Sequence, residues 1–295
     1  MELHELDRQR RTVSTRRGDV SILDVGRGPA ALLVHGVGTN ALLWRNLLPA
    51  VAAERRCIAL DLPRHGRTPA PADGDVSLGG LADVVAACCE ALDLGAVDLV
   101  ANDTGGAVAQ IFAARNPQRI RTMTLTNCET HDNVPPPAFQ ATVDLARAGQ
   151  LAPGAPALLA DLAVARETIF ASGYEHPEAL NLDVVRAFLE PVLGTPEAAR
   201  GFEQLLAGLA PDDLLAVEPA LARLTVPTLV VWGTADPFFE VRWAYWLRDT
   251  IPGVTEVVEL EGAKLFFPDE RASELAGLVL GHWAAAADRT VAPSR

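Results

Sequence analysis

The sequence predicts an α/β protein with a mostly parallel sheet that is covered by helices on both faces. Short apolar runs, each bounded by Gly, Pro, Asp or Asn, alternate along the chain with segments of helical periodicity. Such alternation is typical of parallel strands joined by crossover helices. The one long interruption, 129–225, contains Leu/Ala-rich helical stretches and several prolines but no convincing strand.

Seven apolar runs are predicted strands, because each is short and ends in turn-forming residues. In chain order they are 20–26, 30–36, 56–62, 97–103, 120–127, 227–233 and 255–260. Helical patterns lie between them, at about 43–54, 79–93, 105–116, 240–250 and 270–285. We interpret 132–217 as a helical cap inserted between two strands of one core domain, which consists of 1–131 and 218–295.

Length, composition and charge limit the classes of function. With 295 residues, of which 49% are hydrophobic, the chain can form an α/β core with an insertion. A formal charge of −13 disfavours nucleic acid and membrane surfaces as partners, because both require a basic face. The four cysteines lack the spacing of a disulfide framework or a zinc site. No signal peptide or membrane-spanning stretch is visible. We therefore expect a cytoplasmic monomer or homodimer that takes a small-molecule substrate and needs no cofactor or metal.

The first candidate catalytic residue is Asp103, at the end of the predicted strand 97–103. The segment NDTGG (102–106) joins this strand directly to a predicted helix. A sharp strand-to-helix turn flanked by small residues is the nucleophile-elbow arrangement, which lifts one side chain over the edge of the sheet. The alternative is that Asp103 only caps the helix that follows it.

Two further motifs follow the ends of predicted strands. In HGVGTN (35–40), the His-Gly turn frees the backbone N–H of Val37, which together with the N–H of Thr104 would form an oxyanion hole. We interpret His35 and His65 as structural histidines. In WGTADPFF (232–239), a strand ends at Asp236, where an acid could orient a catalytic base.

The motifs HGVGTN, NDTGG, GTADP (233–237) and GAKLFF (262–267) occur in this order and resemble the α/β-hydrolase superfamily. The resemblance is closest to its haloalkane dehalogenase and epoxide hydrolase branch. It covers about 20–128 and 220–285, whereas the cap agrees only in position and helical character. The resemblance implies an eight-stranded sheet and an aspartate nucleophile whose alkyl ester is hydrolysed by a histidine-activated water. It assigns Asp103 as the nucleophile and Asp236 as the acid, with Glu129 and Asp132 as a second possible acid site.

Lys264, the only lysine of the chain, stands at the position of the catalytic histidine of that branch. Beside Asp103 and Asp236 its ammonium would remain protonated, and a protonated amine cannot activate water. It could instead donate a proton or hold an oxyanion, with Asp103 as the general base. Among the histidines, only His131 is expected near the mouth of the pocket, where capping or solvent exposure is the alternative to substrate contact.

Other departures concern the leaving group. Thr104 and Val37 replace side-chain donors that hold the halide in dehalogenases of this branch, so dehalogenation is disfavoured. Epoxide hydrolases use cap tyrosines as proton donors, and Tyr174 is the only tyrosine in the predicted cap; packing is the alternative role. The pocket is expected to be apolar. The residues predicted to contact the substrate are Trp44, Asn102, His131, Tyr174, Phe238, Phe239 and Phe266.

Three hypotheses remain open on the sequence alone, because a fold does not determine a function. The first is a hydrolase of epoxide- or ester-like substrates that uses Asp103 and an altered base. The second is a lyase, isomerase or cyclase in which Asp103 and Lys264 act as a base and acid pair. The third is a binding protein that has kept the pocket and lost turnover.

Overall fold

The structure is a computed structural model that describes residues 3–291. One eight-stranded sheet runs through it in the order β1-β2-β4-β3-β5-β6-β7-β8. The β1/β2 and β2/β4 pairs are antiparallel, and the other five pairs are parallel. The predicted fold class, an α/β-hydrolase fold with a mostly parallel eight-stranded sheet, is confirmed. The strands are β1 (Arg10–Thr15), β2 (Gly18–Val25), β3 (Ala30–Val34), β4 (Arg56–Leu60), β5 (Val97–Asn102), β6 (Ile120–Thr126), β7 (Thr228–Gly233) and β8 (Val254–Leu260).

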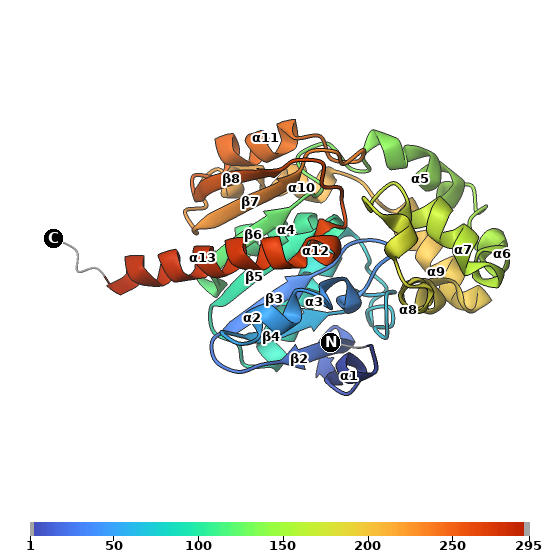
Figure 1. Cartoon of the computed structure of the whole chain (residues 1–295), viewed down its shortest axis with the longest axis horizontal. Helices are drawn as coiled ribbons and strands as arrows, with labels where there is room; N and C mark the ends of the chain where they lie inside the picture. The colour runs from blue at the N-terminus through green and yellow to red at the C-terminus, as the bar shows by residue number, and fades with distance from the viewer. Residues whose placement is uncertain (1–2, 292–295) are drawn as a thin grey trace.

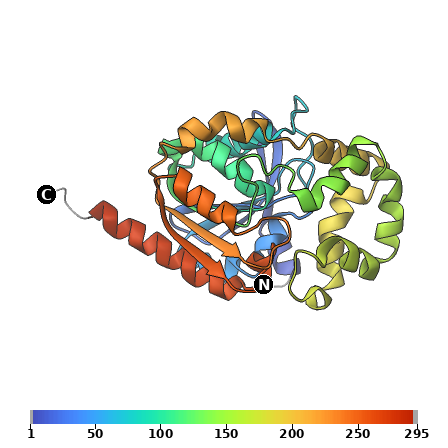
Figure 2. The ribbon, with the colours of Figure 1, turned by 90° about the horizontal axis from the view of Figure 1, so that it is seen from above.

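Helices cover both faces of this sheet. On one face α3 (Leu78–Ala91), α4 (Thr104–Arg115) and α10 (Asp212–Leu221) pack together. On the other face α13 (Ala272–Val291) packs against the sheet and against α2 (Leu48–Val51). Figure 2 shows α13, in red, on the side of the sheet opposite to α10. Every residue of β5 and β7 is buried, which explains why these strands are mostly apolar in the sequence. The remaining core helices are α1 (Leu3–Asp7), α11 (Arg242–Thr250) and α12 (Phe267–Glu270).

Between β6 and β7 the chain forms a helical cap, which lies at one end of the molecule (Figure 1). The predicted cap boundary at residue 217 needs correction, because it falls inside α10, which packs on α3 and α4 of the core. No helix in the described part of the chain is long and apolar enough to cross a bilayer. The cap helices are α5 (Gln140–Arg147), α6 (Ala155–Ala160), α7 (Leu162–Ala165), α8 (Leu182–Leu193) and α9 (Pro196–Ala207).

Candidate active site

Asp103 occupies a strained turn between β5 and α4. Its backbone has φ 57° and ψ −138°, a conformation that costs a non-glycine residue about 1–3 kcal/mol. Gly105 makes the turn possible, because a Cβ there would lie 2.3 Å from the carbonyl oxygens of Val34 and His35. The side chain of Asp103 makes no N-cap hydrogen bond to α4. The turn therefore has the geometry of a nucleophile elbow, and the structure gives no support to Asp103 as a helix cap.

Two backbone N–H groups face the Asp103 carboxylate. Those of Thr104 and Val37 donate hydrogen bonds to it and act to lower its pKa. The backbone at residue 36 can come this close to the Asp103 side chain only because residue 36 is glycine: a Cβ there would lie 2.2 Å from Oδ2 of Asp103. If Asp103 became esterified, its carbonyl oxygen would stay beside donors suited to a developing negative charge. The arrangement has the geometry that the sequence predicts for an oxyanion hole.

Glu129, which follows β6, is a second carboxyl group at this edge of the sheet. Its side chain is buried, and its Oε1 accepts a 2.8 Å hydrogen bond from the hydroxyl of Thr104. Gln110 holds the residue from α4, because its side-chain amide donates to the backbone carbonyl of Glu129 at 2.9 Å. The second oxygen, Oε2, is buried without a hydrogen-bond partner. Burial raises the pKa of Glu129 to about 7.

Asp236 follows β7 and is the third buried carboxyl group. Asn127 donates to its Oδ2 at 2.7 Å, and the backbone N–H of Phe238 donates to its Oδ1 at 2.8 Å. Burial nevertheless raises the pKa of Asp236 to about 6. Asp132, the other acid considered from the sequence, is exposed to solvent, so Glu129 and Asp236 are the acids that the fold brings towards Asp103.

The three carboxyl groups influence one another because they share a small, buried region. The pKa of Asp103 is raised well above its usual value, first by burial and then by the charges of Glu129 and Asp236. Like-charged carboxylates in a poorly solvated site cannot all ionise at neutral pH without a large cost. At least one proton is therefore expected to reside on this group of acids.

Lys264 does not make the contact that the sequence predicts. Its Nζ donates a 3.4 Å hydrogen bond to the backbone carbonyl of Ala171 in the cap, and no ion pair joins it to Asp103 or Asp236 within the described residues. The ammonium still lowers the pKa of Asp236 through space. The prediction of a Lys264–carboxylate contact is thus wrong for this structure, because the ammonium is hydrogen-bonded to the backbone of the cap instead.

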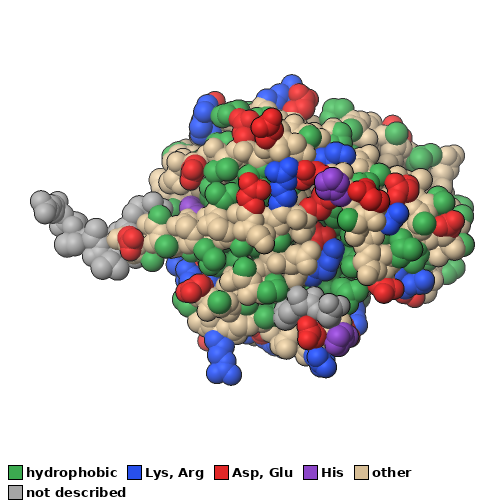
Figure 3. All heavy atoms as spheres, in the orientation of Figure 1, with side chains coloured by type: hydrophobic (Ala, Val, Ile, Leu, Met, Phe, Trp, Pro, Cys, Tyr) green, Lys and Arg blue, Asp and Glu red, His purple; other side chains and the backbone are tan. Residues whose placement is uncertain are grey.

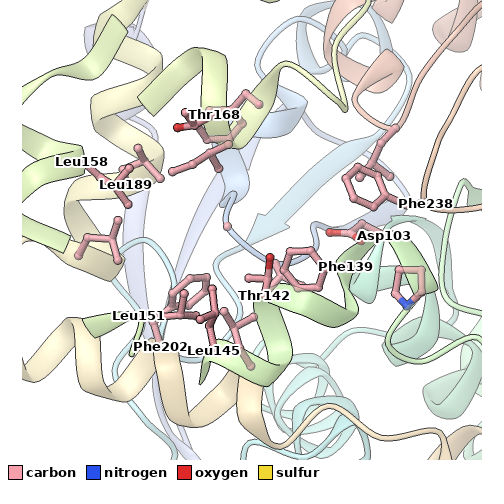
Figure 4. Close-up of a pocket in the computed structure, with 18 of the residues that line it drawn as sticks. Asp103, Phe139, Thr142, Leu145, Leu151, Leu158, Thr168, Leu189, Phe202 and Phe238 are labelled. Carbon is pink, nitrogen blue, oxygen red and sulfur yellow. The ribbon is translucent and has the colours of Figure 1, made fainter. Parts of the chain in front are cut away.

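A cavity of about 460 Å³ lies between the core and the cap, with Asp103 and Glu129 among its lining residues. Of the predicted substrate-contacting residues, Phe238, Phe239 and Phe266 line it, as does Val37. Figure 4 shows Asp103 and Phe238 at one end and Leu158 and Leu189 of the cap at the other. None of the lining side chains carries a positive charge, and besides the two acids only Thr142 and Thr168 have polar side chains. The further apolar lining residues include Pro136, Phe139, Leu145, Leu151, Ile169, Phe170, Leu193, Phe202, Leu206 and Leu265.

Two residues predicted to contact the substrate lie behind the site. Trp44 is completely buried in the core. Asn102 is also buried, and its side-chain amide donates to the hydroxyl of Thr126 at 2.9 Å and to the backbone carbonyl of Leu265 at 3.1 Å. Neither residue is part of the cavity lining. Both predictions are corrected, since Asn102 ties together the strand ends that carry the site and Trp44 fills the core.

Two further predictions fail because polar partners hold the side chains elsewhere. His131 contacts Glu218 through Nδ1 and stacks on Trp246, with ring centroids 5.1 Å apart. Tyr174 is buried, and its hydroxyl donates to Asp269 at 3.1 Å. Neither lines the cavity. The alternatives named for them, surface placement for His131 and packing for Tyr174, agree with the structure.

No histidine replaces the missing catalytic one. All six histidines fall within the described residues, and none lines the cavity. His35 is buried, and its Nε2 accepts the backbone N–H of Leu62 at 2.8 Å. Burial lowers the pKa of His35 to about 4 and that of His65 to about 3, so both are neutral structural residues, as the sequence predicts.

Several cap residues that line the cavity were not predicted from the sequence. Phe139, Thr142, Ile169, Phe170 and Phe202 lie on helices and turns whose apolar positions also form the cap interior. A second apolar face on a cap helix would mark such residues in the sequence. The same pattern also arises from packing inside the cap, and the two can be told apart only when the position of the cap on the sheet is known.

Comparisons with known proteins agree with this geometry. A family profile described as alpha/beta hydrolase fold matches residues 29–270. "Haloalkane dehalogenase 2" of Mycobacterium tuberculosis is 26% identical over 282 residues, which cover 92% of this chain and 93% of the relative. The haloalkane dehalogenase DbeA of Bradyrhizobium elkani superposes with a TM-score of 0.77 at 24% identity, covering 94% of this chain and 99% of that one. The epoxide hydrolase CorEH gives a TM-score of 0.78 at 20% identity, with 94% and 98% covered.

Proposed function

Because the chain belongs to the alpha/beta hydrolase fold family, we propose that it is an enzyme that opens a small, neutral, mostly apolar substrate through Asp103. The substrate is epoxide- or ester-like, and epoxides suit the site better, because a carboxylate attacking a saturated carbon gives a stable alkyl ester. Water then hydrolyses this ester while the N–H groups of Val37 and Thr104 hold the oxyanion.

The observation that carries the proposal is the placement of one carboxylate. Asp103 stands on a strained elbow, lines the apolar cavity, and accepts hydrogen bonds from two backbone N–H groups. The strain favours a functional role, since a turn of this kind persists only when the surrounding structure enforces it. Relatives that are named as haloalkane dehalogenase or epoxide hydrolase support a hydrolase-like activity.

The cavity explains the choice of a neutral substrate. Its lining contains two carboxyl groups and no cationic side chain, so an anionic substrate would be repelled. The reacting group would lie beside Asp103, and an apolar tail would extend towards Leu158 and Leu189 (Figure 4). Burial of such a tail against aliphatic and aromatic side chains provides the binding energy.

The test uses 1,2-epoxyhexane, styrene oxide and 4-nitrophenyl butyrate as probes. Asp103→Asn is expected to abolish turnover, because an amide is a poor nucleophile and a poor base. His131→Gln is the matched control, since His131 lies outside the cavity, and it should retain the wild-type rate. Turnover that survives Asp103→Asn would overturn the proposal. Unchanged binding of a probe by both proteins without any turnover would indicate a binding protein.

A further inference from the structure

Glu129 has one oxygen atom that the folded protein leaves without a partner. The side chain is 1% exposed, and Oε2 is buried with no hydrogen bond, whereas Oε1 accepts from Thr104. A buried carboxylate oxygen without a hydrogen-bond donor destabilises the folded protein, because the charged group has lost its water and gained no partner. The residue also lines the cavity. A proton on Oε2, shared with a substrate atom in the cavity, would remove this cost.

The titratable groups around Glu129 are negative or neutral. Asp103 and Asp236 face it, and the thiol of Cys128 precedes it in the chain. The charge of Lys264 acts on Asp236, and its ammonium is hydrogen-bonded to Ala171. Within the described residues, a proton is therefore the available means of neutralising this cluster.

Hydrogen bonding distinguishes the two carboxyl groups that line the cavity. The carboxylate of Asp103 accepts two backbone N–H groups, which favour its ionised form. The carboxyl group of Glu129 also accepts hydrogen bonds, from the hydroxyl of Thr104 and from its own backbone N–H, but its Oε2 has no donor. When the two acids share one proton, the favoured arrangement has Asp103 ionised, so that it keeps both backbone donors. Glu129 is then protonated on the oxygen that has no donor. Since the two acids titrate as a pair, this describes the favoured distribution of their shared proton.

We propose that Glu129 is the proton donor and proton acceptor of the reaction, in the role that a histidine or a tyrosine would otherwise fill. The inference rests on the proposed function and narrows it to strained cyclic ethers, that is, epoxides with an apolar tail. Their leaving oxygen stays attached to the substrate and needs a proton when the ring opens.

The first step then balances within the site. A carboxylate oxygen of Asp103 forms a bond to one epoxide carbon while the C–O bond of that carbon breaks. The ring oxygen takes the electron pair of the broken bond and the proton from Oε2 of Glu129. The products are a hydroxyalkyl ester on Asp103 and an ionised Glu129.

The second step returns both acids to their starting states. Ionised Glu129 removes a proton from water, whose oxygen adds to the ester carbonyl of Asp103. The N–H groups of Val37 and Thr104 hold the oxyanion of this intermediate. When it collapses, the C–O bond to the alkoxy group breaks, the departing alkoxide takes the proton from Glu129, and the product is a diol. Asp103 is left as a carboxylic acid that carries the second hydrogen of the water. It passes this proton to Glu129, so that Asp103 is ionised and Glu129 is protonated again.

The test follows the opening of 1,2-epoxyhexane by wild type, Glu129→Gln and His131→Gln. The amide of Glu129→Gln can neither donate an acidic proton nor activate water. Opening should slow at least about 100-fold, and any ester formed on Asp103 should persist in the intact-protein mass. His131→Gln, two residues further along and outside the cavity, should behave as wild type.

A pH profile of the wild type provides a second measurement that does not depend on the variant folding. The opening rate should fall above about pH 7 as the pair loses its proton, and Glu129→Gln should lack this decline. If Glu129→Gln keeps both the rate and the decline while Asp103→Asn is inactive, the proposed function stands and the role of Glu129 is overturned. If Lys264→Met instead abolishes the decline, the lysine is the donor. Wild type that opens no epoxide but hydrolyses 4-nitrophenyl butyrate would overturn the role of Glu129 in epoxide opening and leave the proposed function standing. Wild type that turns over neither class of probe would overturn both proposals.

Discussion

Val37 and Thr104 determine which leaving groups the site can stabilise. Val37 has no polar side chain, and the hydroxyl of Thr104 is committed to Glu129 at 2.8 Å. Both backbone N–H groups already serve Asp103. A departing halide would therefore find no free side-chain donor from either residue. A departing alkoxide, by contrast, could take the proton of Glu129.

Haloalkanes should accordingly be poor substrates. With 1-chlorohexane and 1-bromohexane, halide release measured by ion chromatography is expected to be at least about 100-fold slower than opening of 1,2-epoxyhexane, a factor that corresponds to about 3 kcal/mol of lost leaving-group stabilisation. Comparable rates for bromide release and epoxide opening would contradict this reading of the two positions.

Single residues also show how far the sequence could predict the site. Asp103 and Asp236 follow strand ends in motifs with fixed spacing, so their placement could be predicted from the chain alone. The direction of Lys264 could not, because a flexible four-carbon side chain can turn to the acids or to the cap. Glu129 appears in the sequence only as an alternative acid, and its free oxygen is visible only once the packing of Thr104 and Gln110 is known.

At the scale of elements, the cap is fastened to the core through a buried polar cluster. Tyr174 donates to Asp269 at 3.1 Å, and Arg45 forms an ion pair with the same carboxylate. Arg271 binds Glu175 through two hydrogen bonds of 2.7 and 2.6 Å. These contacts join the cap segment at 174–175 to the region around α12, directly after the loop that carries Lys264.

Tyr174→Phe tests whether this tyrosine fastens the cap or donates a proton. Loss of its hydrogen bond to a carboxylate should lower the free energy of unfolding by about 1.5–3 kcal/mol, measured by urea denaturation. The rate of epoxide opening per folded molecule should change little, because Tyr174 does not line the cavity. A rate loss of tenfold or more without loss of stability would instead support the proton-donor role.

Elements differ in how well the sequence predicts them. The seven apolar runs correspond to β2–β8, because buried strands are recognisable by composition. β1 (RRTVST) is absent from that pattern, since it is an edge strand with one buried residue. The final helix continues past the predicted end at 285, to Val291, and Figure 1 shows its end projecting beyond the sheet. Amphipathicity could not set that boundary, because residues 287 and 288, just past the predicted end, are exposed.

For the whole molecule, the partners remain predictions. On the face shown in Figure 3, acidic and basic side chains are interspersed, and the net charge is −13. We still expect a small-molecule substrate, no nucleic acid or membrane partner, a monomer or homodimer, and a cytoplasmic location.

The buried acids give the folded protein a characteristic pH dependence. Burial raises the pKa of Glu129 from 4.5 to about 7 and that of Asp236 from 3.8 to about 6. Their contribution to stability is complete below the unfolded values and is lost as pH rises through the folded values. At about 1.4 kcal/mol per pKa unit, Glu129 alone would account for up to about 3 kcal/mol.

Urea unfolding at about pH 5 and pH 8 measures this contribution. The free energy of unfolding should be higher at pH 5, and the difference should shrink in Glu129→Gln, whose amide does not titrate. Asp24 and Asp75 do not contribute to this difference, because their pKa values are lowered and they titrate below pH 5. Equal stability at both pH values, or a difference that Glu129→Gln leaves unchanged, would contradict the raised pKa of Glu129.

The central claim, that Asp103 is the nucleophile, is tested most directly by a single turnover in ¹⁸O-labelled water. Excess enzyme is reacted with 1,2-epoxyhexane, and both the diol and the peptide that contains Asp103 are analysed by mass spectrometry. If water attacks the ester carbonyl, the heavy oxygen enters the Asp103 carboxylate and the first diol formed is unlabelled. Label in the diol with none in the peptide would show that water attacks the epoxide directly and would contradict the account.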